Sequence, residues 1–105
     1  MAIISDQLRA SLPPLFAQEA DDDPVVYARL FLPGTSLNWY VLEGGVTKEH
    51  GFVLSCLFVG REEWSFGHFP ESFLEQFRGP NGEVIEIDTA FPTGRLHDVV
   101  PAPDS

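Results

Sequence analysis

The side chains that most often carry chemistry are few in this sequence and stand far apart. The three histidines are His50, His68 and His97, and the single cysteine is Cys56. Zinc sites need short, regular spacings such as H-E-x-x-H, which these four residues do not form. Cys56 lies in the apolar run FVLSCLFV, where burial raises the pKa of a thiol and makes it unreactive. The sequence therefore predicts no metal site, no cofactor and no cysteine nucleophile.

Paired carboxylates and glycine-rich loops are the next candidates for catalysis. Glu62 and Glu63 precede Trp64, an arrangement that could place an acid pair in a cleft, as in glycoside hydrolases. Adjacent residues on a strand point to opposite faces, however, so the two carboxylates do not share a site. Gly44-Gly45 lacks the lysine and serine of a phosphate-binding loop, and no G-x-S-x-G motif occurs. We expect no catalytic residue and no enzyme activity.

Acidic residues cluster in two predicted loops. The first cluster is Asp21, Asp22 and Asp23, and the second is Glu62 and Glu63. A calcium loop alternates its ligands and carries a glycine, as in D-x-[DN]-x-[DN]-G, and the aspartate cluster has neither feature. Adjacent like charges repel, so we expect a solvated loop there. These five residues are the candidate partner-binding residues.

Charge is the strongest compositional signal. Sixteen Asp and Glu residues stand against six Lys and Arg, which gives a formal net charge of −10. Such a surface repels nucleic acid and anionic lipid headgroups, so we expect no direct contact with nucleic acid or membrane. A basic protein surface would be attracted instead. The alternative interpretation is that the acidity only keeps a small protein soluble.

Length and composition predict one domain. The chain has 105 residues, 44% of them apolar, which is enough for a single core. The segment MAIISDQLRA lacks the pattern of a signal peptide, and no apolar run approaches the roughly 20 residues that span a bilayer. We therefore expect a cytoplasmic domain over residues 1–105, with a loose tail from about residue 97. The oligomeric state stays open.

Hydrophobic spacing and turn residues predict the elements. Apolar residues at helical spacing, with Ser5 and Asp6 as caps, predict a helix over residues 3–12. Five runs of β-forming residues predict strands, the first carrying Val26, Ala28 and Leu30 on one apolar face. These runs are residues 25–32, 37–43, 52–59, 64–69 and 83–88. Gly44-Gly45 is expected in a polar connection.

The rest of the predicted fold is arranged around residues 64–82, WSFGHFPESFLEQFRGPNG, which predict the end of a strand, a short helix and a turn. Pro70 fits the first turn of a helix of two to three turns, and an apolar stripe that includes Leu74 predicts its buried side. Gly79 is expected as its left-handed C-terminal residue, and Asn81-Gly82 as a turn. The predicted fold is α+β: an antiparallel sheet of four to five strands with one or two short helices packed on one face. Arg78 and Asp88 are expected to form a structural ion pair across the turn.

Four segments carry a resemblance to a known family: LPPLFAQE, DPVVYARLFLPGTSLNWYVLE, FGHFPESFLEQFRGPNG and EIDTAF. In this order they resemble an uncharacterised bacterial family, the domain of unknown function numbered 2958, over about residues 12–96 of this chain. The most specific parts are the LPPL opening, Trp39-Tyr40, the G-x-F at Gly67, the R-G-P at Arg78, and Asp88 followed by Phe91.

Three positions or segments depart from that family's pattern. Pro70 stands where a capping serine is usual, Ile87 stands where an arginine often precedes the aspartate, and residues 56–63 match only loosely. Members are commonly seen on plasmids and other mobile elements. The resemblance therefore implies a mobile-element setting, and it implies no known activity, ligand or catalytic residue.

The leading functional hypothesis is a small acidic protein-binding domain that occludes a basic surface through the two acidic clusters. With the mobile-element setting, its concrete form is an inhibitor of a host defence system, such as a restriction or CRISPR effector. These effectors hold nucleic acid in channels lined by Lys and Arg, so an acidic face that mimics DNA charge could compete.

Two alternatives remain from the sequence. One is an accessory or adaptor module that binds a partner through an apolar patch near Trp39, Tyr40 or Trp64, with binding insensitive to salt. The other is a small enzyme or ligand binder with a pocket lined by Trp64, His68 and Asp88.

Overall fold

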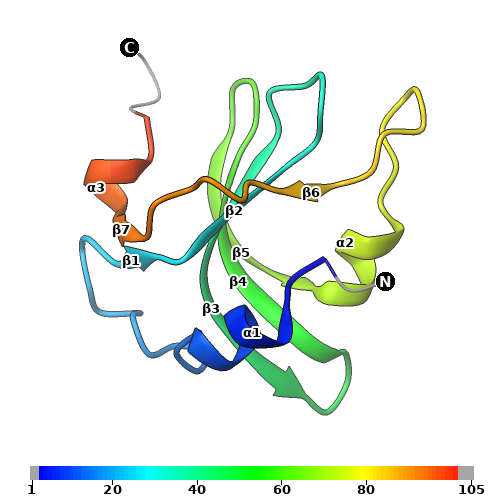
Figure 1. Ribbon diagram of the computed structural model, residues 1–105. Helices are drawn as coiled ribbons and strands as arrows, with labels where there is room; N and C mark the ends of the chain where they lie inside the picture. Colours follow the sequence, from blue (N-terminus) through cyan, green and yellow to red (C-terminus); the bar gives the residue numbers. More distant parts are fainter. Residues whose placement is uncertain (1–2, 102–105) are drawn as a thin grey trace.

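A computed structural model describes residues 3–101, and over these residues the architecture is α+β, as predicted (Figure 1). A five-stranded antiparallel sheet has the order β5-β4-β3-β2-β6, and β1 pairs with β7 in a separate two-stranded sheet. The helices are α1 (Asp6–Ser11), α2 (Glu71–Gln76) and α3 (Leu96–Val99); the strands are β1 (Val25–Val26), β2 (Ala28–Phe31), β3 (Asn38–Thr47), β4 (Gly51–Val59), β5 (Trp64–Pro70), β6 (Glu86–Ile87) and β7 (Gly94–Arg95). No helix within residues 3–101 is long and apolar enough to cross a membrane.

The main sheet has two faces with different covers. The first face carries Leu30, Trp39 and Leu54; it packs under α2, which supplies Leu74, and under the segment around α1, where Ile4 precedes the helix and Leu8 lies within it. The second face carries Tyr40 and Leu57, and residues of the C-terminal segment around α3 pack on it. Both α1 and α2 thus lie against one face, which is the predicted arrangement, while α3 covers part of the other.

An irregularity at Tyr27 divides the predicted strand of residues 25–32 into β1 and β2. Tyr27 N donates to Val41 O at 2.8 Å, while Ala28 is the paired residue opposite Val41, so Tyr27 and Ala28 both lie opposite one residue of β3. Because Tyr27 is an extra residue here, Val26 packs with the second-face cluster, whereas Ala28 packs with the first-face cluster. The prediction that Val26 shares a face with Ala28 is therefore wrong, although both residues are buried.

Gly44 and Gly45 lie inside β3 and do not form the expected connection. β3 pairs with β4 as far as Thr47, and the segment after α1 crosses directly over the two glycines. Gly44 N donates to Pro13 O at 3.0 Å, and a Cβ on Gly44 would lie 2.9 Å from a Leu12 methyl carbon. These glycines allow a close approach of two chain segments, which is a different use of glycine from a turn.

α2 is shorter than predicted and ends differently. Phe77 is its C-cap in an extended conformation, with φ −62° and ψ 136°, and Arg78 then forms a β-bridge with Val84. Gly79 does not have positive φ, whereas Gly82 does, at +84°, as its turn requires. Strand pairing after Phe77 thus replaces the expected left-handed helix end.

The predicted ion pair between Arg78 and Asp88 is wrong. The Arg78 guanidinium donates to the carbonyl oxygens of Glu75 and Phe77, at the end of α2. Asp88 instead pairs with Arg29 on the adjacent strand, with Arg29 Nη1 at 2.9 Å from Asp88 Oδ2. Burial raises the pKa of the neighbouring Tyr40 phenol, and the Arg29 charge partly offsets this shift.

Residues 97–100 are ordered, although a loose tail was expected from about residue 97. α3 spans Leu96–Val99, and Val100 is buried on the second face. Asp23 Oδ1 accepts a hydrogen bond from His97 N at 2.8 Å, so a loop distant in sequence caps this helix. Residues 102–105 of the predicted tail lie outside the described residues.

Cys56 provides a direct test of the core. It is completely buried on the first face, and burial raises the pKa of its thiol far above the ordinary value. We expect no reaction with an aromatic disulfide reagent in buffer and full reaction in denaturant, because the thiolate forms only after unfolding. Release of the coloured thiol, followed by absorbance, measures this. Rapid release from the folded protein would contradict the packing.

Candidate functional site

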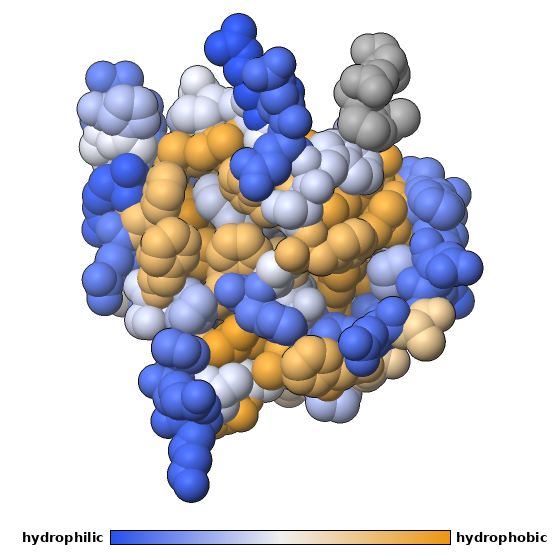
Figure 2. Space-filling view, turned by 180° about the vertical axis from the view of Figure 1, so that it is seen from behind, coloured by the Kyte–Doolittle hydropathy of each residue, from blue (hydrophilic) through white to orange (hydrophobic). Residues whose placement is uncertain are grey.

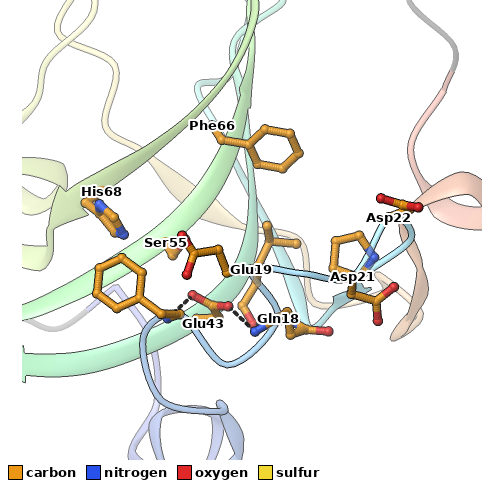
Figure 3. Close-up of a pocket in the computed structure, with 11 residues that line it drawn as sticks. Gln18, Glu19, Asp21, Asp22, Glu43, Ser55, Phe66 and His68 are labelled. Atoms are coloured by element: carbon orange, nitrogen blue, oxygen red, sulfur yellow. Dashed lines mark hydrogen bonds between the residues drawn. The ribbon is translucent and has the colours of Figure 1, made fainter.

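A pocket lies on the second face of the main sheet. Its volume is about 430 Å³, and it lies between strands β3, β4 and β5 and the loop that precedes β1 (Figure 3). We call the loop of residues 16–24 the rim loop. The lining residues are Phe16, Gln18, Glu19, Asp21, Asp22 and Pro24 from the rim loop, Leu42 and Glu43 from β3, Ser55 from β4, and Phe66 and His68 from β5.

Glu43 anchors the rim loop to the sheet. Only 4% of this residue is exposed, and its two carboxylate oxygens accept hydrogen bonds from Phe16 N at 2.7 Å and Gln18 N at 2.6 Å. A register shift between Val41 and Glu43 places both Leu42 and Glu43 toward the second face. Without this bulge, strict alternation would put Glu43 on the first face with Val41.

Gln18 forms a second anchor beside Glu43. Its side-chain nitrogen donates to Val25 O and Leu42 O, each at 3.0 Å, and its side-chain oxygen accepts from Val25 N at 2.7 Å. One amide group therefore joins the rim loop, β1 and β3. Together with Glu43 it satisfies backbone groups that no regular strand pairing reaches.

Phe16 is held in an unusual conformation at the edge of the pocket. Its φ is +71°, a left-handed value that costs a bulky residue roughly 1–3 kcal/mol. The side chain is 59% exposed, and its ring lies edge-on to the ring of His68, with centroids 5.3 Å apart. The hydrogen bond from Phe16 N to Glu43 holds this exposed ring in place.

The β4 and β5 wall presents alternate residues to the pocket. Ser55 is paired with His68, and Leu57 with Phe66, so Ser55, Phe66 and His68 point to the same side. Phe66 is 64% exposed and stands across the cavity from the rim loop (Figure 3). Two aromatic residues and a histidine thus form the more apolar walls of the pocket.

The pocket is strongly acidic. Four of its lining residues are Asp or Glu, and none is Lys or Arg. Asp21 pairs with Arg95 at 3.1 Å, outside the cavity, and Glu43 is bound by the two amides. The side chains of Glu19 and Asp22 have no hydrogen-bond or ion-pair partner among residues 3–101. The carboxylates of Glu19 and Asp22 are therefore available to a bound molecule.

The neighbouring Ser55 and His68 do not form a nucleophile and base pair. No hydrogen bond joins their side chains within the described part of the chain, and Glu43 is engaged by the rim loop. Ser55 lies within β4 and not in a tight turn. A nucleophilic serine needs a base within hydrogen-bond reach and a third group that orients this base. What the pocket does present is a set of carboxylate and aromatic side chains, which are groups that bind and orient a molecule.

The aspartate cluster divides into structural and free members. Asp21 accepts a hydrogen bond from Asp23 N and pairs with Arg95, and Asp23 binds His97 N. Of the three aspartates, only Asp22 is both exposed and without a side-chain partner among residues 3–101. Asp21 and Asp22 are exposed, as expected for a solvated loop, and Asp21 and Asp23 in addition bind Arg95 of β7 and His97 N of α3.

Glu62 and Glu63 occupy the turn between β4 and β5. Both are exposed, Gly60 N donates to Glu63 O at 2.8 Å, and Ser65 Oγ donates to Glu63 Oε2 at 3.3 Å. Figure 1 places this turn at the top of the view and the rim loop at the lower left. The two acidic clusters therefore form two separate surfaces, and only the aspartate cluster borders the pocket.

The aromatic residues proposed for an adaptor patch or a ligand pocket are mostly internal. Trp39 and Tyr40 are 2% and 4% exposed, so they cannot form a surface patch. Trp64 is half-buried beside the second-face cluster, and Asp88 is paired with Arg29. Of the predicted pocket residues, only His68 lines the observed cavity.

Sequence reasoning missed most of the lining residues, among them Phe16, Gln18, Glu19, Glu43 and Phe66. Glu43 could have been noticed as the one charged residue within the strand NWYVLEGGVT. Phe66 could have been noticed from alternation, which places it on the same face as Trp64 and His68. Phe16 and Gln18 carry no comparable signal, because the rim loop has no periodic pattern.

Comparison with known proteins adds no assignment to this geometry. No family model matches the chain, and no match was found among curated proteins or solved structures.

Proposed function

We propose that this protein is an acidic protein-binding domain that occupies a basic surface of a partner protein. The observation that carries the proposal is the charge: sixteen acidic residues against six basic ones. Three of the basic residues are also neutralised internally, since Arg9, Arg29 and Arg95 pair with Glu71, Asp88 and Asp21. Each of these pairs neutralises one acid and one base, so the excess of negative charge remains and is what a basic partner surface would recognise.

In its most specific form, the proposal is inhibition of a host defence system by a protein of a mobile element. This setting is what the resemblance of the sequence to a family seen on plasmids implies, and the resemblance is itself part of the proposal, since no family model matches the chain. Restriction and CRISPR effectors hold nucleic acid in basic channels, and a rigid acidic domain could compete for such a channel. The proposal places the protein in the cytoplasm, where these effectors act, and gives it no catalytic role.

Removal of exposed acidic residues tests the proposal. In the variant Asp22→Asn, Glu62→Gln, Glu63→Gln, we expect about tenfold weaker binding to a captured partner at low salt, since each exposed charge contact contributes roughly 0.5 kcal/mol. The partner is captured from a bacterial lysate at about 50 mM salt and should be released at about 500 mM. Its DNA binding should be inhibited by the wild-type protein in a competition assay.

A matched control variant has the same net charge as the test variant. The variant Asp6→Asn, Glu49→Gln, Glu86→Gln removes three exposed acids elsewhere on the surface and should retain partner binding. The structural residues Asp21 and Asp23 are left unchanged. Equal binding by both variants at both salt concentrations, or a partner that has no nucleic-acid-binding activity, would contradict the proposal.

Apolar exposure favours the adaptor role as a second candidate. Figure 2 shows apolar residues gathered at the centre of one face of the molecule, with hydrophilic residues around them. Among the most exposed large apolar side chains are Phe16 and Phe66, which line the pocket. An adaptor that binds through these rings would hold its partner equally well at low and high salt.

A further inference from the structure

We propose that the pocket receives one cationic side chain, an arginine or a lysine, from a basic segment of the partner. The positive end would lie beside Glu19, with Asp22 adding negative charge farther along the rim loop, and the alkyl stem would lie between Phe16 and Phe66. This proposal rests on the proposed function, because it names the part of the basic surface that this protein binds. It is argued from the shape, walls and charge of the cavity.

The cavity has a suitable size. Its volume of about 430 Å³ lies within the range of roughly 300–1,000 Å³ that is typical of ligand pockets. A single long side chain, together with the backbone that carries it, fits in this space. The volume is far too small for a folded element, so an inserted side chain is the natural protein-derived occupant.

The walls suit an organic cation. Phe16 and Phe66 expose their rings at the cavity, and His68 lies edge-on to Phe16. Aromatic faces attract Lys and Arg, and they also cover the apolar stems of these side chains. Metal ions in proteins are usually held by His, Cys, Asp or Glu side chains. Within residues 3–101, no three residues of these types are placed to hold a metal ion. The wall chemistry therefore favours an alkylammonium or guanidinium group.

The charge of the pocket selects the sign of the occupant. Figure 3 shows the Glu19 side chain directed from the rim loop toward the β-strand wall, and the Asp22 side chain apart from it, farther along the same loop. Glu43 adds a third carboxylate at the base. Its two oxygens each accept one amide, while an ionised carboxylate offers about four acceptor positions. With no basic residue in the lining, a cation would gain attraction that a neutral side chain would not.

The pocket is also held ready before binding. Glu43 and Gln18 fix the rim loop through five hydrogen bonds to or from the backbone. Phe16 is thereby kept in its left-handed conformation, with the ring at the edge of the cavity. Less ordering is needed on binding when the walls are already in place, and this increases affinity.

Short peptides test the proposal on the full chain. The probes are acetylated glycine peptides with one central arginine, lysine or citrulline, and acetyl-arginine amide as a free small molecule. We expect the arginine and lysine peptides to shift the NMR signals of Phe16, Phe66 and His68. Citrulline keeps the shape of arginine without its charge, and it should bind at least tenfold more weakly. Equal binding of citrulline, or signal shifts confined to other surfaces, would overturn the proposal.

Separate variants measure how much the carboxylates and the aromatic walls of the pocket each contribute to peptide binding. Glu19→Gln with Asp22→Asn should weaken the arginine peptide about tenfold, and Phe66→Ala should weaken it about threefold to tenfold. The matched controls are Asp6→Asn with Glu49→Gln, and Phe73→Ala, which alter two exposed acids and an exposed phenylalanine outside the pocket. Backbone NMR spectra show that each variant is folded. Equal losses in the control variants would overturn the proposal.

The outcomes distinguish this proposal from the proposed function. A basic partner that binds normally when the pocket variants no longer bind arginine peptide would refute the pocket as its docking site and leave the charge-based function intact. Peptide binding in the pocket, with no basic protein captured, would support the cation site and count against the proposed function. Stronger binding of free acetyl-arginine amide than of the peptides would refute a partner side chain and indicate a small organic cation.

Discussion

Replacing Glu43 with alanine is expected to lower the free energy of unfolding by about 3 kcal/mol. The change removes the acceptor of two short hydrogen bonds and leaves Phe16 N and Gln18 N without a partner. Each unsatisfied buried donor costs roughly 1–3 kcal/mol. A domain of this size has a total stability of about 5–15 kcal/mol, so the loss is a large share. Urea unfolding, followed by tryptophan fluorescence, measures it.

Two variants make the Glu43 result specific. Glu43→Gln keeps one acceptor oxygen but turns an NH₂ group toward the other amide, so roughly half of the loss is expected. Glu49→Ala removes an exposed carboxylate at the β3–β4 turn and should change stability by less than about 0.5 kcal/mol. Hydrogen exchange of the Phe16 and Gln18 amides should accelerate in Glu43→Ala. Wild-type exchange and an unchanged urea midpoint would contradict the anchoring role.

The fold class was predictable because it depends on local patterns. Alternation identified the strands of the main sheet, and Ser5 was correctly named as a helix cap, since its hydroxyl accepts from Leu8 N. The buried core residues Leu30 and Leu54 also follow from their apolar runs. Local spacing is sufficient for these features, because each strand or helix buries the face that its own sequence makes apolar.

The errors occurred where distant segments decide the structure. Gly44 and Gly45 resemble turn residues, but the crossing segment after α1 requires them inside a strand. Asp88 finds Arg29 in place of Arg78, because strand pairing brings β6 beside β2. Asp23 is a cap for a helix that begins at Leu96. None of these partners is close in sequence, so spacing alone could not identify them.

The pocket was hidden by a bulge and by the rim loop. Strict alternation assigns Glu43 to the same face as Val41, and only the register shift brings it to the other face. Gln18 then lies 24 residues from the carbonyl of Leu42 that it binds. His68 alone was a predicted pocket residue that proved correct. A site assembled from one irregular loop and three strands leaves little trace in sequence periodicity.

Gln18→Ala is expected to lower the free energy of unfolding by about 2 kcal/mol. The side chain makes three hydrogen bonds, two to Val25 and one to Leu42. Each contributes roughly 0.5–1.5 kcal/mol when its loss is partly compensated by water. These three bonds join neutral groups, and bonds of this kind are weaker than those made by a carboxylate, which is why the expected loss is smaller than for Glu43→Ala. Gln76→Ala, on the exposed side of α2, is the matched control.

Combining the two substitutions should cost less than their sum. Glu43 accepts the backbone amide of Gln18, so release of the rim loop by either change removes part of what the other holds. Residues in one hydrogen-bond network show coupling of roughly 0.5–3 kcal/mol in double-mutant cycles. For Glu43→Ala with Gln18→Ala, we expect a total loss at least about 1 kcal/mol below additivity. Strict additivity would mean that the two anchors act independently, and the rim loop would then not be a single cooperative unit that keeps Phe16 at the pocket.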